Sequence, residues 1–296
     1  MQGPFISVVI PTYNSENFIT KTLETVFSQT YNNYEVIISD DGSSDNTVET
    51  ARAVLYKYGH RENKILTNPH EGAAAARNRG IEAVTGDWIS FLDSDDLWFK
   101  EKLSVVADYI LRNEVDVICH SAIEKGNGKE ILIKRYKFYN PNVSPFLSLY
   151  RSNAIGTTTI TVKKNLLVGA GLFDKSLPAA HDYDLWLRMA MVPDIKIGFI
   201  KEPLTYCITR KGNISSNIEK RLECLLTIGE KYYKDLKKSS NFPRIERARY
   251  RGRAFASSGL ALIRMGNLKR GFVLLFTGLA RWPFRFDWII KLIKNN

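Results

Sequence analysis

Residues 34–58 of the chain read YEVIISDDGSSDNTVETARAVLYKY, and this stretch decides the fold class. Its first six residues, 34–39, are rich in β-branched and apolar side chains and predict a buried strand. The polar run 40–46 predicts a turn, and residues 47–58 have the apolar spacing of an amphipathic helix. A strand followed by a turn and a helix is half of a βαβ unit, which builds parallel sheets.

The same alternation continues on both sides of this stretch. Strands are predicted at 6–10, 64–67 and 88–92, and helices at 16–29 and 73–84. Such a series predicts an α/β fold with a doubly wound, mainly parallel sheet, whose ligands bind at the carboxyl ends of the strands. Polar clusters follow three of the strands: Thr12-Tyr13-Asn14, Asp40-Asp41-Gly42-Ser43 and Asp93-Ser94-Asp95-Asp96.

The pattern is less regular in the second half of the chain. The pattern predicts a turn between two strands at 124–129 and a further strand at 157–163. It then predicts a helix that opens with carboxylates at 182–191 and a helical tail at 217–296. We expect the tail to break at Gly266 and again at Pro283. We expect a catalytic domain at 1–216, with a nucleotide-binding half at 1–120 and an acceptor-binding half at 121–216. A basic helical region is expected at 217–296.

Charge is distributed unevenly along the 296 residues, whose net charge is +11. Residues 1–219 hold 24 basic and 26 acidic side chains, whereas residues 220–296 hold 18 against 5, a net charge of +13. The hydrophobic share of 44% is that of a globular protein. The longest apolar run, 271–280, falls short of the roughly 20 residues that a membrane-spanning helix needs. We therefore expect no spanning helix.

The N-terminus and the cysteines point to a cytoplasmic protein. The first residues lack the basic region of a signal peptide, and their apolar stretch stops at Pro11 before any cleavage site of small residues. Three widely spaced cysteines, at 119, 207 and 224, form no CxxC pair, so neither a disulfide framework nor a zinc site is predicted.

Each polar cluster also has a structural interpretation. Ser44 or Asp45 would serve as the N-cap of the helix that follows, and Tyr13 would be a packed surface aromatic. The run 93–96 is harder to explain in that way, because three carboxylates within four residues repel one another unless a cation or hydrogen-bond donors neutralise them. Mg²⁺ and Mn²⁺ take oxygen ligands of this kind, usually together with substrate phosphates.

Taken together, the chain resembles the family 2 glycosyltransferases, which have the GT-A fold. Six motifs carry the resemblance over about residues 4–210, in this order: Val8–Asn14, Ser39–Asp45, Ala76–Asn78 with Gly80, Gly86–Asp96 with Trp98, Gly171–Asp174 and Asp182–Arg188. The resemblance implies a GT-A-like sheet with a helical C-terminal extension. It also implies an enzyme that moves a sugar from a nucleotide diphosphate sugar, usually a UDP-sugar, to an acceptor hydroxyl.

The resemblance assigns nucleotide-binding residues. It implies that Pro11, Thr12 and Tyr13 line the nucleobase pocket, with Tyr13 stacked on the base, and that Asp41 accepts a hydrogen bond from the imide N–H of the base. Arg77 would approach the diphosphate, and the alternative for Arg77 is a surface salt bridge on a helix.

Metal and catalytic roles are implied as well. Asp93 would lie near the ribose, and Asp93 and Asp95 would hold Mn²⁺ or Mg²⁺ against the diphosphate. Asp182 would be the general base that takes the proton of the acceptor hydroxyl; its alternative is a carboxylate that stabilises a helix N-terminus.

The chain departs from the family pattern in three places. His181 stands where the family has Glu before the catalytic Asp, and we expect it on the acceptor side. Residues 206–213 lack the family's histidine, so Arg210 or Lys211 would contact the diphosphate instead. The Gln-x-x-Arg-Trp motif of processive synthases is missing, which favours transfer of a single sugar, and one base without a second nucleophile favours inversion.

Other functions and partners stay open at this stage. A non-catalytic scaffold of the same fold is one alternative. A Mg²⁺-dependent phosphatase is another, although the Asp-x-Asp pattern of such enzymes has Thr or Val at the position where this chain has Leu97. The mixture of basic and aromatic residues in 267–296 favours attachment to an anionic membrane on its cytoplasmic face, over a merely packed extension or nucleic-acid binding. The acceptor expected is a lipid-linked sugar or another polysaccharide or cell-envelope glycan.

Overall fold

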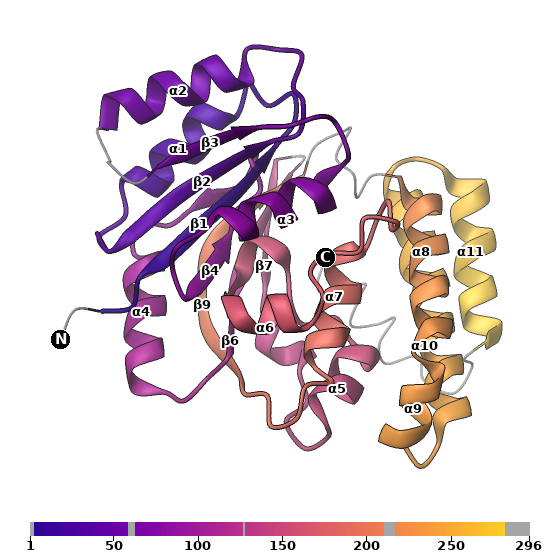
Figure 1. The fold of residues 1–296 in the computed structure, drawn as a ribbon. Helices are drawn as coiled ribbons and strands as arrows, with labels where there is room; N and C mark the ends of the chain where they lie inside the picture. The colour runs from indigo at the N-terminus through magenta and orange to yellow at the C-terminus, as the bar shows by residue number, and fades with distance from the viewer. Residues whose placement is uncertain (1–2, 59–62, 127, 210–216, 282–296) are drawn as a thin grey trace. The chain divides into compact units, whose positions relative to one another are not determined.

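The computed structural model shows two compact units. The residues that it describes are 3–58, 63–126, 128–209 and 217–281 (Figure 1). Of these, the first unit takes the residues up to 139, then 154–176 and 181–209, and the second takes 140–153, 177–180 and 217–281. The predicted boundary between 216 and 217 stays a prediction.

The first unit is built on a sheet of nine strands. Its N-terminal half consists of four parallel strands in the spatial order β3-β2-β1-β4: Lys64–Thr67, Tyr34–Asp40, Ile6–Thr12 and Trp88–Phe91. Because these strands run in one direction, their carboxyl ends meet at one edge of the sheet (Figure 1). The predicted polar clusters follow the strands at that edge.

The sheet continues beyond β4 with strands of both directions. The spatial order is β4-β8-β6-β9-β5, with β7 beside β6. In chain order, strands β5 to β9 are Leu97–Trp98, Val117–Gly126, Lys129–Ile133, Ile160–Lys163 and Ile197–Ile208. The pair β6 and β9 is parallel, whereas β8 runs antiparallel to both β4 and β6. The predicted α/β fold with its doubly wound sheet is confirmed, as a mixed sheet.

Helices cover both faces of the parallel half. Helices α1, α2 and α4 (Ile19–Phe27, Thr47–Tyr58 and Lys102–Arg112) pack with Ile6, Val8 and Ile10 of β1 in one core. On the opposite face, α3 (Ala73–Ala83) approaches Val9 closely, since a Cβ added to Gly80 would lie 2.4 Å from the Val9 Cγ1 atom. Burial on both faces explains why β1 reads as a continuous apolar run.

The remaining helices of this unit follow the later strands. They are α6, Lys164–Gly169, and α7, His181–Met189. The predicted strand 157–163 begins late, because residues 157–159 form a 3₁₀ turn in which the amide of Thr159 donates to the Gly156 carbonyl at 3.0 Å. The two-residue strand β5 was not predicted; it exists only through its pairing with β9.

The second unit is helical. It contains α5 and α8 to α11, with the bounds Pro145–Arg151, Ile218–Lys231, Tyr233–Ser239, Pro243–Arg264 and Leu268–Arg281. Helices α10 and α11 pack through glycines, since a Cβ added to Gly278 would come within 2.5 Å of the Gly252 carbonyl oxygen. The predicted break at Gly266 is confirmed, and Pro283 lies outside the described residues. Among the described helices, none combines the length and apolar character needed to cross a bilayer.

Candidate active site

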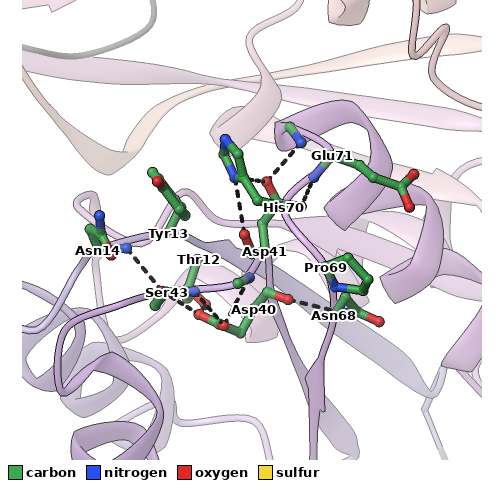
Figure 2. A network of polar contacts seen from close by, with 12 residues as sticks. Thr12, Tyr13, Asn14, Asp40, Asp41, Ser43, Asn68, Pro69, His70 and Glu71 are labelled. Atoms are coloured by element: carbon green, nitrogen blue, oxygen red, sulfur yellow. Dashed lines mark hydrogen bonds and ion pairs between the residues drawn. The ribbon is translucent and has the colours of Figure 1, made fainter.

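The loops after β1 and β2 are joined by hydrogen bonds (Figure 2). The Thr12 hydroxyl donates to Asp40 Oδ1 at 3.1 Å, and the amide of Asn14 donates to the Ser43 hydroxyl at 2.9 Å. In return, the Ser44 amide donates to the Asn14 side-chain oxygen at 2.9 Å. These bonds fix the backbone at the edge where Tyr13 projects, and Tyr13 keeps 47% of its surface exposed.

Pro11 and Asp45 also belong to this region. Pro11 lies buried inside β1, in register with Ser39 of β2. Asp45 stands before α2 and accepts a hydrogen bond from the amide of Thr47 at 3.0 Å, so the capping interpretation holds for Asp45.

Asp41 is a buried carboxylate that points toward the start of α3. Its side chain is 2% exposed. It accepts hydrogen bonds from the amides of Glu71 and Gly72 at 3.0 and 2.7 Å, and the imidazole Nδ1 of His70 lies 2.9 Å from its Oδ2 atom (Figure 2). The negative charge thus lies at the N-terminal end of α3, where the helix dipole favours it.

His70 also stacks on Tyr13, with ring centroids 4.2 Å apart and an angle of 24° between the ring planes. His70 was not among the residues expected at the site. One signal could have found it: His70 follows β3 at the same carboxyl edge as the predicted clusters.

Arg77 links three segments of the first unit. Its Nη2 donates to Asp93 Oδ1 at 2.5 Å, and its Nη1 lies 2.9 Å from His181 Nε2. The guanidinium is a permanent donor, so His181 Nε2 accepts. The Arg77 side chain is only 8% exposed, and its Nε finds no hydrogen-bond partner among the described residues. The surface salt bridge considered for Arg77 is therefore wrong; this cation is buried.

The carboxylates that follow β4 lie in three environments. Asp93 keeps 35% of its side chain exposed beside Arg77, and Asp95 is half-buried. Asp96 is buried and accepts a hydrogen bond from the Ile208 amide at 2.7 Å. Burial, and then the charges of Asp93 and Asp95, raise the pKa of Asp96 well above its usual range. Mutual repulsion between these carboxylates, expected from the sequence, is thus present at Asp96.

A divalent cation fits this donor set in part. Across the described residues, no group of three or more His, Cys, Asp or Glu side chains is arranged to hold a metal ion. Mg²⁺ and Mn²⁺ are often bound by one or two carboxylates plus substrate phosphates, and Asp93 and Asp95 supply hard oxygen ligands of that kind. The fit therefore requires phosphate oxygens from a ligand.

Asp182 lies in the first turn of α7. Its Oδ2 accepts a hydrogen bond from the Thr157 hydroxyl at 3.1 Å, and its Oδ1 accepts from the Tyr183 amide at 2.8 Å. Asp184, two residues later, is fully buried and paired with Arg188, at 2.9 Å between Oδ2 and Nε. Of these two carboxylates, Asp182 is half-buried and Asp184 has no exposed surface.

The remaining motif residues hold these groups in place. Arg188 donates to the carbonyls of Ala170 and Leu172, and Asn78 exchanges two hydrogen bonds of 2.9 Å with the backbone of Phe173. The Phe173 ring packs edge-on against His181. His181 is thus buried beside Arg77. Arg210 and Lys211, which were expected to contact the diphosphate, lie outside the described residues.

Comparisons with known proteins identify the family. The model of glycosyl transferase family 2 matches residues 7–167. A UDP-Glc:alpha-D-GlcNAc-diphosphoundecaprenol beta-1,3-glucosyltransferase of Escherichia coli, WfgD, is 33% identical over 229 residues, which cover 75% of this chain and 84% of WfgD. The chain therefore belongs to glycosyl transferase family 2.

Solved structures share the fold. The structure of Staphylococcus aureus TarS 1–349 in complex with UDP is similar with a TM-score of 0.67 and 18% identity, covering 95% of this chain and 93% of that one. The mannosyltransferase PcManGT of Pyrobaculum calidifontis, in complex with GDP-Man and Mn²⁺, gives a TM-score of 0.62 at 20% identity, with coverage of 96% and 81%. At these identities the likeness concerns the fold alone.

Proposed function

We propose that the chain is an inverting glycosyltransferase that moves one sugar from a UDP-sugar to an acceptor hydroxyl. One observation carries the proposal: the buried guanidinium of Arg77 joins Asp93, on the expected donor side, to His181, which precedes the expected base Asp182. These contacts support a donor site and a base that lie together at the carboxyl edge of the sheet. The names of WfgD and of the TarS complex, which both include UDP or a UDP-sugar, support this donor.

Each residue has a task in the proposed reaction. Tyr13 stacks on the nucleobase, and Asp41 accepts a hydrogen bond from the imide N–H of that base. Arg77, whose Nε is buried without a partner among the described residues, donates to the diphosphate. Asp93 and Asp95 would hold Mn²⁺ or Mg²⁺, which as a Lewis acid stabilises the negative charge of the leaving diphosphate.

Asp182 takes the proton of the acceptor hydroxyl. The acceptor oxygen forms a bond to the anomeric carbon while the bond from that carbon to the phosphate oxygen breaks, and its electron pair leaves with UDP. A single attack of this kind inverts the anomeric configuration. The experiment is to supply UDP-sugars with candidate acceptors and to read the anomeric configuration of the product by NMR. A product with retained configuration would contradict the proposed single displacement.

The non-catalytic alternative is tested by the donor alone. A working transferase releases UDP slowly from a UDP-sugar when water replaces the acceptor, whereas a scaffold protein releases none. Measured UDP release that depends on Asp182 would support the enzyme, and the absence of release and of transfer with every donor would favour the scaffold.

We further propose a lipid-linked acceptor and attachment to the cytoplasmic face of an anionic membrane through residues 267–296. Exposed apolar side chains on α11 (Leu268, Phe272, Val273 and Phe276) support this, together with the net charge of +13 in residues 220–296 and the acceptor named for WfgD. Deletion of 267–296 should abolish sedimentation with anionic liposomes, and salt should weaken it in the full chain. Full-length protein that ignores anionic liposomes at low salt would rule out this attachment.

A further inference from the structure

The imidazole of His70 makes two contacts that resemble those of a nucleobase. The ring stacks on Tyr13, and its Nδ1 lies 2.9 Å from Asp41 Oδ2 and 3.0 Å from the Asp41 carbonyl oxygen (Figure 2). Both neighbours of Nδ1 are acceptors, so Nδ1 carries the proton and donates. His70 thus offers a planar ring to Tyr13 and a ring N–H to Asp41.

A uracil in the nucleotide site proposed above would use the same two partners. Resting on that site, we propose that the His70 imidazole occupies the position of the nucleobase in the unliganded chain and turns away when the donor binds. His70 then competes with the base for Tyr13 and Asp41, and Asp41 discriminates between bases. A base replaces it fully only if it carries a ring N–H at the edge that faces Asp41, as uracil does, whereas cytosine presents a lone pair there.

The backbone around His70 is held in place, so the exchange falls to the side chain. The amide and the side-chain Nδ2 of Asn68 donate to the Asp40 carbonyl at 3.1 and 3.0 Å, and Glu71 and Gly72 are bound by Asp41. The His70 side chain is 56% exposed, although its ring covers Tyr13. Exposed side chains change rotamer within nanoseconds, so the exchange needs no movement of the loop.

Competition from His70 lowers the apparent affinity for the donor. The chain is open when the imidazole has turned away from Tyr13. A ligand that binds only this open form has an apparent dissociation constant equal to its intrinsic constant divided by the open fraction. Because the His70 side chain is 56% exposed, its stacked ring and its hydrogen bond are taken at the lower end of their typical strengths, which holds the open fraction to roughly 3–20%. Removal of the imidazole should therefore tighten UDP binding about 5- to 30-fold.

The experiment is calorimetric titration of UDP and CDP, with Mn²⁺, into the full chain and its variants. His70→Ala should bind UDP about 5- to 30-fold more tightly than the wild type. His70→Phe, which keeps a ring for Tyr13 and loses the donor for Asp41, should fall between them. Tyr13→Ala should weaken UDP binding and reduce the gain from His70→Ala, since both the base and the imidazole lose their platform.

Thermal unfolding of each variant separates binding from folding. If His70→Ala unfolds at the wild-type temperature and binds UDP equally or more weakly, the proposal for His70 is wrong, and the imidazole is a bystander or a partner of the bound base. CDP binding as tight as UDP binding would overturn the selectivity assigned to Asp41. If neither the wild type nor His70→Ala binds any nucleotide, the nucleotide site itself is wrong.

Discussion

The two ends of strand β2 carry carboxylates that differ in their partners and not in their burial. Glu35, at the start of the strand, is 1% exposed, and Asp41, just after its end, is 2% exposed. Glu35 accepts hydrogen bonds from the buried Ser7 hydroxyl at 2.7 Å and from the amide and hydroxyl of Thr85 at 2.5 and 2.9 Å. Asp41 accepts from backbone amides too, and the Arg79 guanidinium lies 3.5 Å from its Oδ1 atom. Its closest side-chain partner, His70, is exposed.

Two carboxylates that are equally buried thus differ in how closely an exposed side chain approaches them. Every hydrogen-bond donor to Glu35 belongs to the folded framework, and the exposed ammonium of Lys64 stays 4.0 Å from its Oε2 atom. We therefore expect no ligand to replace these donors in the folded chain. One donor to Asp41 can leave while the backbone stays in place. We therefore expect substitutions at the amino end of the sheet to change stability, and substitutions at the carboxyl edge to change binding or turnover.

The largest effect should come from Asp182 at the carboxyl edge. Asp182→Asn removes the proposed base and should lower the rate of transfer about 10²- to 10⁴-fold, while UDP affinity stays near that of the wild type. Initial rates and UDP titrations measure the two quantities. Asp194→Asn makes the same chemical change at an exposed residue and serves as the control. Full activity of Asp182→Asn would remove Asp182 from the mechanism.

Arg77→Gln should have the next largest effect. The variant loses charged hydrogen bonds to Asp93 and to the diphosphate, and UDP affinity should fall roughly 10- to 100-fold. Arg52→Gln, on an exposed face of α2, is the matched control and should bind as the wild type does. Unchanged UDP binding by Arg77→Gln would mean that the buried cation serves the fold alone.

Glu35→Gln should affect stability and leave UDP binding unchanged. Loss of the charge weakens the hydrogen bonds from Ser7 and Thr85 and should cost about 1–2 kcal/mol of unfolding free energy, measured by urea denaturation. Glu82→Gln, at an exposed position, is the control. A Glu35→Gln variant of full stability and weakened UDP affinity would break the comparison between the two ends of β2.

The stability lost in Glu35→Gln should depend on pH. Burial raises the pKa of Glu35, whereas the hydrogen bonds from Thr85, Ser7 and Gly86 lower it. The combined effect of the hydrogen bonds is larger than the effect of burial, so the pKa lies below its usual value of 4.5. A lowered pKa in the folded state adds stability that is complete above the unfolded value and is lost as the pH falls through the folded value. The wild type and the variant should thus differ fully above about pH 5 and converge in more acidic solution.

Asp95→Asn should have the smallest effect, and only with metal. The variant should bind UDP as the wild type does when EDTA is present, and about tenfold more weakly with Mn²⁺, because one carboxylate ligand is lost. Asp87→Asn, an exposed residue before β4, is the control. An equal response to Mn²⁺ in the wild type and Asp95→Asn would place the metal elsewhere or exclude it from binding.

Much of the fold could be predicted because its signals are local. The series of strands and helices up to residue 92 lies where the apolar periodicity placed it, with ends that differ by up to three residues. The helix expected from residue 16 begins at Ile19, since the amides of Phe18 and Ile19 first turn back to the Ser15 carbonyl. Strand β5 carried no such signal, because two residues have no periodicity of their own.

The sequence by itself determined the α/β class and the edge of the sheet at which most of the candidate residues gather. These follow from the order of strands and from residue types, which are properties of neighbouring positions. The tertiary structure alone decided which groups meet: Arg77 with His181, 104 residues later, and Tyr13 with His70. Such contacts depend on how distant strands align, and no local periodicity encodes that alignment.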